Sequence, residues 1–158
     1  MHEHQIDVAC VTEINLDLTK ALVKYKLNKK ARKFDKNKSL IMASSSSFTL
    51  STKTKRGGLL TYTRDNWSGR EIEKGKENLG RWTYVTLSGK ANSKVIIITL
   101  YRVCNQKNYG DGGCTIYMQQ EADLQAADRK CIDPQEAILD YLTEYITTLK
   151  RKQYDVIY

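Results

Sequence analysis

The chain has 158 residues, of which 41% are hydrophobic, so it is long and apolar enough for one domain with a sizeable core. It carries 26 Lys and Arg against 18 Asp and Glu, and its formal net charge of +8 favours polyanionic partners. No apolar run approaches the roughly 18 residues of a membrane span, and residues 1–5 lack an apolar signal segment. We therefore expect an intracellular protein without a membrane-spanning segment.

The four cysteines, at positions 10, 104, 114 and 131, form no Cys-x-x-Cys pair. No His lies near them at the spacing of a zinc site. We interpret all four as reduced thiols, which agrees with an intracellular location. Cys10 lies in an apolar run and is predicted to be a small buried hydrophobic residue.

The first predicted elements are a strand and a long helix. Residues 6–11 are continuously apolar, which is typical of a strand buried on both faces, and Glu13 and Asn15 follow its end. Asp17 is a suitable N-cap for a helix over residues 18–34, whose first half has one apolar face.

Four further strands are predicted between residues 39 and 101. The last of them is the most apolar run in the sequence, and we expect it to be a central strand, paired antiparallel with its predecessor through a turn at residues 88–93. Residues 66–80 are polar and are predicted to be a connection without regular structure. The four strands span residues 39–43, 59–63, 81–87 and 94–101.

The C-terminal part is predicted to contain a loop, two helices and a strand. Residues 105–115 are rich in Gly and are expected to form the loop, followed by a short helix at 116–127. The second helix has the stronger signals, because Asp133 is a suitable N-cap and Pro134 suits the first helical position. The last five residues, YDVIY, form an apolar run that is typical of a buried strand.

Glu13 and the pair Tyr101-Arg102 are the candidate functional residues. A carboxylate at a strand end is a candidate ligand for Mg²⁺, which prefers oxygen and keeps waters for a substrate phosphate. A phenol and a guanidinium at the end of the central strand are candidate phosphate contacts. From spacing alone, a surface acid is the better interpretation of Glu13, and a core-edge Tyr beside a solvated Arg fits as well as a phosphate contact.

Other patterns give weaker indications. Gly57-Gly58 could let the backbone approach a nucleic-acid strand closely, and a simple turn is the better interpretation. The basic segments 20–38 and 53–70 fit either a solvated face or a nucleic-acid groove. Both His residues, His2 and His4, lie at the extreme N-terminus without further ligands, which disfavours a self-contained hydrolase that uses His as base.

Taken in order, these segments resemble the endonuclease/exonuclease/phosphatase superfamily. DVACVTEINLD resembles the strand that carries its metal-binding Glu, and GGLLTYTRDNW resembles the strand that follows. GRWTYVTLSGKANSKVIIITLYRVC resembles the paired strands leading to the family's Tyr, and Tyr-Arg there is particularly like the endonuclease domains attached to reverse transcriptases in retrotransposon-like elements. DPQEAILDYLTEYI and YDVIY resemble the helix and the strand that come next.

The resemblance implies a Mg²⁺- or Mn²⁺-dependent endonuclease or phosphodiesterase acting on nucleic acid, with DNA as the expected partner. Glu13 would hold the metal, Tyr101 would hydrogen-bond the scissile phosphate, Arg102 would add positive charge, and Asn15 would support the site. The implied fold is α/β: part of a four-layer sandwich with mixed, largely antiparallel sheets and outer helices.

The chain departs from the family pattern at both ends. The first Asn-bearing strand, the Gly-Asp-x-Asn motif and the later Asp and Asp-His residues are missing, so residues 1–158 are expected to be an incomplete domain without useful nuclease activity. An isolated part of a sandwich should also leave a sheet face uncovered and associate through it. Two alternatives stay open: a non-catalytic basic nucleic-acid-binding module, and a vestigial product of a mobile element.

Overall fold

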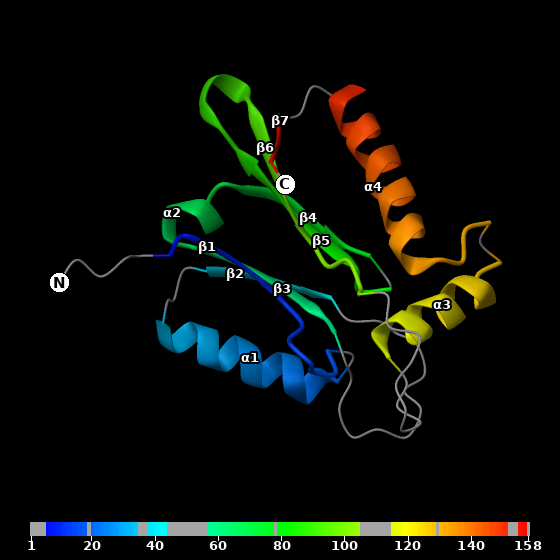
Figure 1. Cartoon of the computed structure of the whole chain (residues 1–158). Helices are drawn as coiled ribbons and strands as arrows, with labels where there is room; N and C mark the ends of the chain where they lie inside the picture. Colours follow the sequence, from blue (N-terminus) through cyan, green and yellow to red (C-terminus); the bar gives the residue numbers. More distant parts are fainter. Residues whose placement is uncertain are drawn as a thin grey trace.

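The computed structural model of the chain describes residues 6–18, 20–34, 38–43, 57–77, 79–104, 115–128, 130–151 and 155–157. Two sheets lie face to face at its centre, with a long helix on the outer side of each (Figure 1). The order of layers is therefore helix, sheet, sheet, helix. This arrangement confirms the predicted α/β sandwich with outer helices.

The first sheet has three strands in the order β1-β3-β2, and both of its pairs are antiparallel. Its strands are β1 (Val8–Thr12), β2 (Lys38–Ala43) and β3 (Leu59–Arg64). Side chains of the central strand β3 alternate between buried and half-buried, as expected for a strand with one face toward the second sheet.

The second sheet has four strands in the order β4-β5-β6-β7. Its pairs are antiparallel except for β6 with β7, which is parallel, so the sheets are mixed and largely antiparallel as predicted. The strands are β4 (Glu71–Lys76), β5 (Trp82–Ser88), β6 (Lys94–Leu100) and β7 (Asp155–Ile157). The apolar strand β6 is central in its sheet, and a short 3-10 turn, η1 (Lys90–Asn92), joins it to β5.

The helices cover the outer faces of the sheets. Helix α1 (Ala21–Phe34) lies outside the three-stranded sheet, and α4 (Pro134–Arg151) lies outside the four-stranded sheet (Figure 1). Of the two shorter helices, α2 (Asp65–Ser68) directly follows β3, and α3 (Ile116–Ala126) directly precedes α4. The expected uncovered sheet face is therefore not seen in the described part of the chain, and association through such a face stays a prediction. None of the described helices is long and apolar enough to cross a bilayer.

Helix α4 is fixed by a cap and an apolar stripe. The Asp133 carboxylate accepts a hydrogen bond from the Gln135 amide at 2.8 Å, which confirms the predicted N-cap. The apolar stripe of α4 packs on the outer face of the four-stranded sheet, where Leu149 of the helix joins Ile96 and Ile98 of β6 in a buried cluster. The side chains packed against them are Trp82, Tyr84, Leu142, Tyr145 and Ile146.

The interface between the two sheets contains a hydrogen-bonded threonine cluster. The hydroxyl of Thr61 on β3 lies 2.7 Å from that of Thr83 on β5 and 2.6 Å from that of Thr99 on β6. All three side chains are buried. Their mutual hydrogen bonds offset the cost of removing hydroxyls from water and fix where one sheet lies on the other.

Two predictions about local structure are wrong. Strand β1 is not buried on both faces: it is an edge strand, and Cys10 and Val11 are exposed. The segment 66–80 is not irregular, because it contains most of α2 and the strand β4. Polar β4 is held by pairing with β5, where Gly75 leaves room for the Tyr84 ring; a Cβ at Gly75 would lie 2.1 Å from that ring.

Candidate active site

Glu13 lies in a sharp turn directly after β1. Strand β1 ends at Thr12, and the backbone of both Glu13 and Asn15 is left-handed, with φ of 55° and 50°. Such values are uncommon for residues other than Gly and cost free energy unless the surroundings hold them. The turn exposes the Glu13 side chain at the rim of the three-stranded sheet.

Asn15 holds this turn by binding the backbone of Gly57 in both directions. The Asn15 amide donates to the Gly57 carbonyl at 2.8 Å, and the Asn15 side-chain oxygen accepts from the Gly57 amide at 2.9 Å. Asn15 thus ties the turn that carries Glu13 to the segment that leads into β3, and its role in support of a metal site stays a prediction.

Gly57 and Gly58 allow the turn to come close. Their φ values are 79° and 91°, a region that favours glycine. A Cβ at Gly58 would lie 3.0 Å from Cγ1 of Ile14 and 3.3 Å from the carbonyl oxygen of Ala43. Gly57-Gly58 thus contact the Glu13 turn of the same chain, and a close approach to a nucleic-acid strand stays a prediction.

Tyr101 meets Glu13 from the other sheet. It follows β6, and its amide donates to the Arg81 carbonyl at 2.9 Å. Its hydroxyl donates to Oε1 of Glu13 at 2.7 Å, which joins two residues 88 positions apart. Burial first, then the hydrogen bond and the negative charge of Glu13, raise the pKa of Tyr101 well above its ordinary value. The phenol therefore stays protonated and acts as a donor.

Arg102 does not join this pair. Its side chain is exposed, and no hydrogen bond or ion pair to it is found in the described part of the chain. The structure thus brings Glu13, Asn15 and Tyr101 to one rim and leaves Arg102 next to them along the chain, facing solvent.

Arg81 is a supporting residue that the sequence did not single out. It is fully buried, forms an ion pair with Glu77, and its guanidinium lies 5.0 Å from the centre of the Tyr141 ring. Its carbonyl is the one that holds the Tyr101 backbone. Arg is seldom buried without a partner, and here the partner is Glu77. The sequence Gly-Arg-Trp around Arg81 gives no sign of this ion pair, so the burial of Arg81 could not be predicted.

The donor set fits one protein ligand of a hard cation. In the described ranges no group of three or more His, Cys, Asp and Glu is close enough to surround a metal ion. Glu13 supplies one carboxylate, of which Oε1 is engaged by Tyr101. Mg²⁺ is commonly held through one or two carboxylates and keeps several waters, so a single exposed carboxylate suits it better than zinc.

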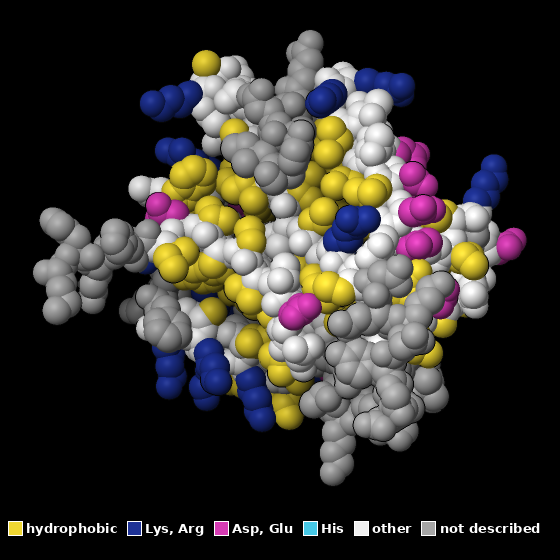
Figure 2. All heavy atoms as spheres, viewed as in Figure 1, with side chains coloured by type: hydrophobic (Ala, Val, Ile, Leu, Met, Phe, Trp, Pro, Cys, Tyr) yellow, Lys and Arg dark blue, Asp and Glu magenta, His cyan; other side chains and the backbone are white. Residues whose placement is uncertain are grey.

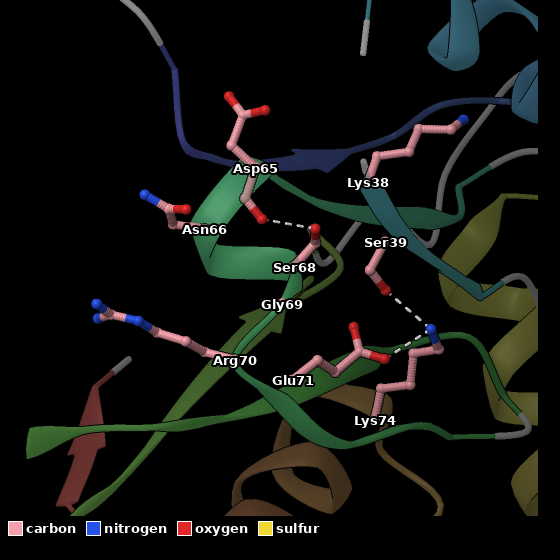
Figure 3. A pocket seen from close by; sticks show the side chains of 9 residues that line it. All are labelled: Lys38, Ser39, Asp65, Asn66, Ser68, Gly69, Arg70, Glu71 and Lys74. Carbon is pink, nitrogen blue, oxygen red and sulfur yellow. Dashed lines mark hydrogen bonds and ion pairs between the residues drawn. The ribbon is translucent and has the colours of Figure 1, made fainter. Parts of the chain in front are cut away.

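A separate polar cavity of about 1010 Å³ lies between the edges of the two sheets, away from Glu13 (Figure 3). Within it, Nζ of Lys74 on β4 binds both Glu71 and the hydroxyl of Ser39 on β2. Asp65 and Arg70 point away from each other and away from this network (Figure 3). Lys74 Nζ, Glu71 Oε1 and the Ser39 hydroxyl thus tie the two sheets together, whereas the second carboxylate oxygen of Glu71 is buried without a hydrogen-bond partner among the described residues.

Comparison of the chain with family models, with curated proteins and with solved structures gave no match. The functional assignment therefore depends on the geometry around Glu13 and on the motif resemblance.

Proposed function

We propose that the Glu13–Tyr101 rim is part of a Mg²⁺- or Mn²⁺-dependent phosphodiesterase site that acts on nucleic acid. The observation that carries the proposal is the 2.7 Å hydrogen bond between these two side chains. They lie far apart in sequence, follow strands of different sheets, and both belong to the segments that resemble the superfamily's motifs. Two surface residues chosen at random would not be expected to be in contact, so their contact supports the motif resemblance.

Each residue has a distinct role in this proposal. The Glu13 carboxylate holds the cation, which when bound offsets charge on the phosphoryl oxygens. The protonated Tyr101 hydroxyl both orients that carboxylate and can donate to a phosphate oxygen. Arg102, exposed beside Tyr101, adds positive charge for the same phosphate, and Asn15 keeps the turn in place.

The chain by itself is not expected to cleave its substrate. His2 and His4 lie outside the described residues, and the described residues contain no group of three or more His, Cys, Asp and Glu that could hold a metal ion. A site in which Glu13 is the single identified metal ligand and no base is identified lacks groups whose individual loss commonly costs about 10²- to 10⁴-fold in rate. We therefore expect cation binding without useful turnover.

Metal binding tests the assignment independently of turnover. Mn²⁺ titration of the full chain, followed by electron paramagnetic resonance of the free ion, should show a weak site that Glu13→Gln removes. Glu144→Gln, at an exposed position on α4, is the matched control and should bind as the parent does. Unchanged Mn²⁺ binding by Glu13→Gln would show that this carboxylate is not the ligand.

Cleavage is measured in parallel with plasmid and abasic DNA in the presence of Mg²⁺. No cut product is expected from the parent chain. Robust cleavage that disappears with Glu13→Ala would contradict the predicted inactivity while retaining Glu13 in its role.

A second candidate function is a non-catalytic nucleic-acid-binding module. It is favoured by the basic charge of helix α1, whose own residues include no acidic side chain. Salt-dependent binding of nucleic acid that neither EDTA nor Glu13→Ala alters would support it. A vestigial mobile-element product, in contrast, would show neither metal nor nucleic-acid binding.

A further inference from the structure

Helix α1 presents a surface that the metal site does not use. Its sequence, ALVKYKLNKKARKF, contains six basic residues and no acidic residue. Lys26, Lys29, Arg32 and Lys33 are exposed, and basic side chains gather over this helix at the lower edge of the molecule (Figures 1 and 2). The charge is therefore concentrated on one element.

Within the described ranges, the exposed cations of α1 have no ion-pair partner. Among the residues that the structure describes, none of Lys26, Lys29, Arg32 and Lys33 forms an ion pair. Basic residues elsewhere do form such pairs. Those pairs are Lys20–Asp17, Arg64–Asp65, Lys74–Glu71 and Arg81–Glu77. Like charges at neighbouring helical positions repel one another, so an anionic partner would relieve this repulsion.

An exposed aromatic ring accompanies the basic residues. Tyr25 is 61% exposed, next to Lys26 and one helical turn before Lys29. Tyrosine rings on such surfaces stack on unpaired bases, whereas the bases of a duplex are already stacked on one another. The combination of ring and cations fits a single strand better than a duplex.

The same surface fits a membrane poorly. An interfacial helix needs a continuous apolar face for insertion into lipid. The apolar residues Val23, Leu27 and Ala31 of α1 are half-buried, and Leu27 and Ala31 line a groove against the sheet. On the exposed side, Leu22 and Tyr25 are the large apolar side chains at its N-terminal end. Toward the C-terminal end of the helix, the exposed side carries Lys29, Arg32 and Lys33.

We propose that the exposed side of α1 binds single-stranded nucleic acid, with Lys26, Lys29 and Arg32 on the phosphates and Tyr25 against a base. From Lys26 to Lys33 the helix rises by about 10 Å, so these cations form a row along which the backbone of one strand can lie. This binding narrows the second candidate function to one helix and does not require that Glu13 hold a metal.

The test measures fluorescence anisotropy of a labelled single-stranded oligonucleotide with the full chain in EDTA, at several salt concentrations. The variant Lys26→Gln/Lys29→Gln/Arg32→Gln removes three cations while keeping residues that favour a helix. The control Lys90→Gln/Lys150→Gln/Arg151→Gln removes the same charge at exposed positions on the second sheet and α4. Circular dichroism checks that both variants are folded.

Loss of three phosphate contacts should lower the slope of log affinity against log salt by about 2, because each contact on a single strand contributes about 0.7. The control should change the slope little. Tyr25→Ala should weaken binding of the single strand by about fivefold or more and leave duplex binding unchanged. Glu13→Ala should bind as the parent does, which separates this surface from the proposed metal site.

Three results would overturn the proposal. Equal losses in the two triple variants would show that net charge alone drives binding. Unchanged affinity of Tyr25→Ala would remove the base contact. Vesicles containing anionic lipid that displace the oligonucleotide, and that bind more tightly than it does, would make a membrane surface the partner.

Discussion

Replacement of Gly58 by Ala tests the turn that presents Glu13. Gly58 has φ of 91°, which L-residues rarely adopt, and such strain costs about 1–3 kcal/mol. The added Cβ would also lie 3.0 Å from the Ile14 side chain and 3.3 Å from the Ala43 carbonyl, so the Glu13 turn or β2 must shift. Together these effects should lower the free energy of unfolding by about 2–4 kcal/mol.

Gly69 provides the matched control for this substitution. Its φ of −68° and ψ of −18° are helical, and a Cβ there would meet its nearest atom at an ordinary 3.7 Å. Gly69→Ala should therefore be neutral or stabilise by up to about 1 kcal/mol, because it restricts the unfolded chain. Urea denaturation followed by circular dichroism measures both variants, with the slope of the transition checked for constancy.

Mn²⁺ binding adds a second measurement for the same variant. A turn displaced by the Gly58→Ala side chain should weaken binding at Glu13, while Gly69→Ala should leave it unchanged. If Gly58→Ala were as stable as Gly69→Ala, neither the left-handed conformation nor the close contact with Ile14 would be needed for the fold. The account of how Glu13 is positioned would then be wrong.

Three further predictions concern the threonine cluster, the α4 cap and the tyrosines. Thr61→Val leaves two buried hydroxyls without their shared partner, so urea denaturation should show a loss of about 2–4 kcal/mol. Asp133→Ala removes the α4 cap and also the hydrogen-bond acceptor of the buried Tyr117 hydroxyl, so it should lower the unfolding free energy by about 2–4 kcal/mol, whereas Asp140→Ala, exposed on the same helix, should change it by less than about 0.5 kcal/mol. Because the folded-state pKa of Tyr101 is raised, its contribution to stability should be complete below pH 10 and fall above it, where the unfolded chain ionises first. Tyr101→Phe should make this decline shallower, with the remaining slope due in part to Tyr117, whose pKa burial also raises; an unchanged slope would contradict the assignment.

The strands and helices with strong local signals were predictable. Strand β6 is a long apolar run and α4 combines a capping Asp with Pro at its first position, so local composition and tertiary packing favour the same structure. Strand β4 was missed because its sequence, EIEKGK, is polar and contains a glycine. It forms a strand only because β5 lies beside it, and single-sequence patterns do not contain that information.

The sequence selected two residues that lie in contact, Glu13 and Tyr101, while their roles stay predictions and their geometry could not be predicted. The motif resemblance selected Glu13 and Tyr101, which do meet, and Asn15, which supports the turn. The left-handed backbone at Glu13 and Asn15 was not foreseen, because these residue types adopt many other conformations. The burial of Arg81 was missed for a similar reason, since its partner becomes apparent only in the folded chain.

The threonine cluster explains why two sheets can deliver one site. Thr61 on β3 lies opposite Cys10 on β1, and Cys10 is three positions before Glu13. Thr99, bonded to Thr61, lies two positions before Tyr101 on the strand of the other sheet. The hydroxyl pair therefore fixes β1 and β6 relative to each other close to the point where each strand ends. An apolar interface of the same size would hold the sheets together without specifying their relative position, because hydrophobic contacts are non-directional. The Glu13–Tyr101 distance thus depends on buried hydroxyl contacts between the sheets, and Thr61→Val should loosen the rim as well as destabilise the fold.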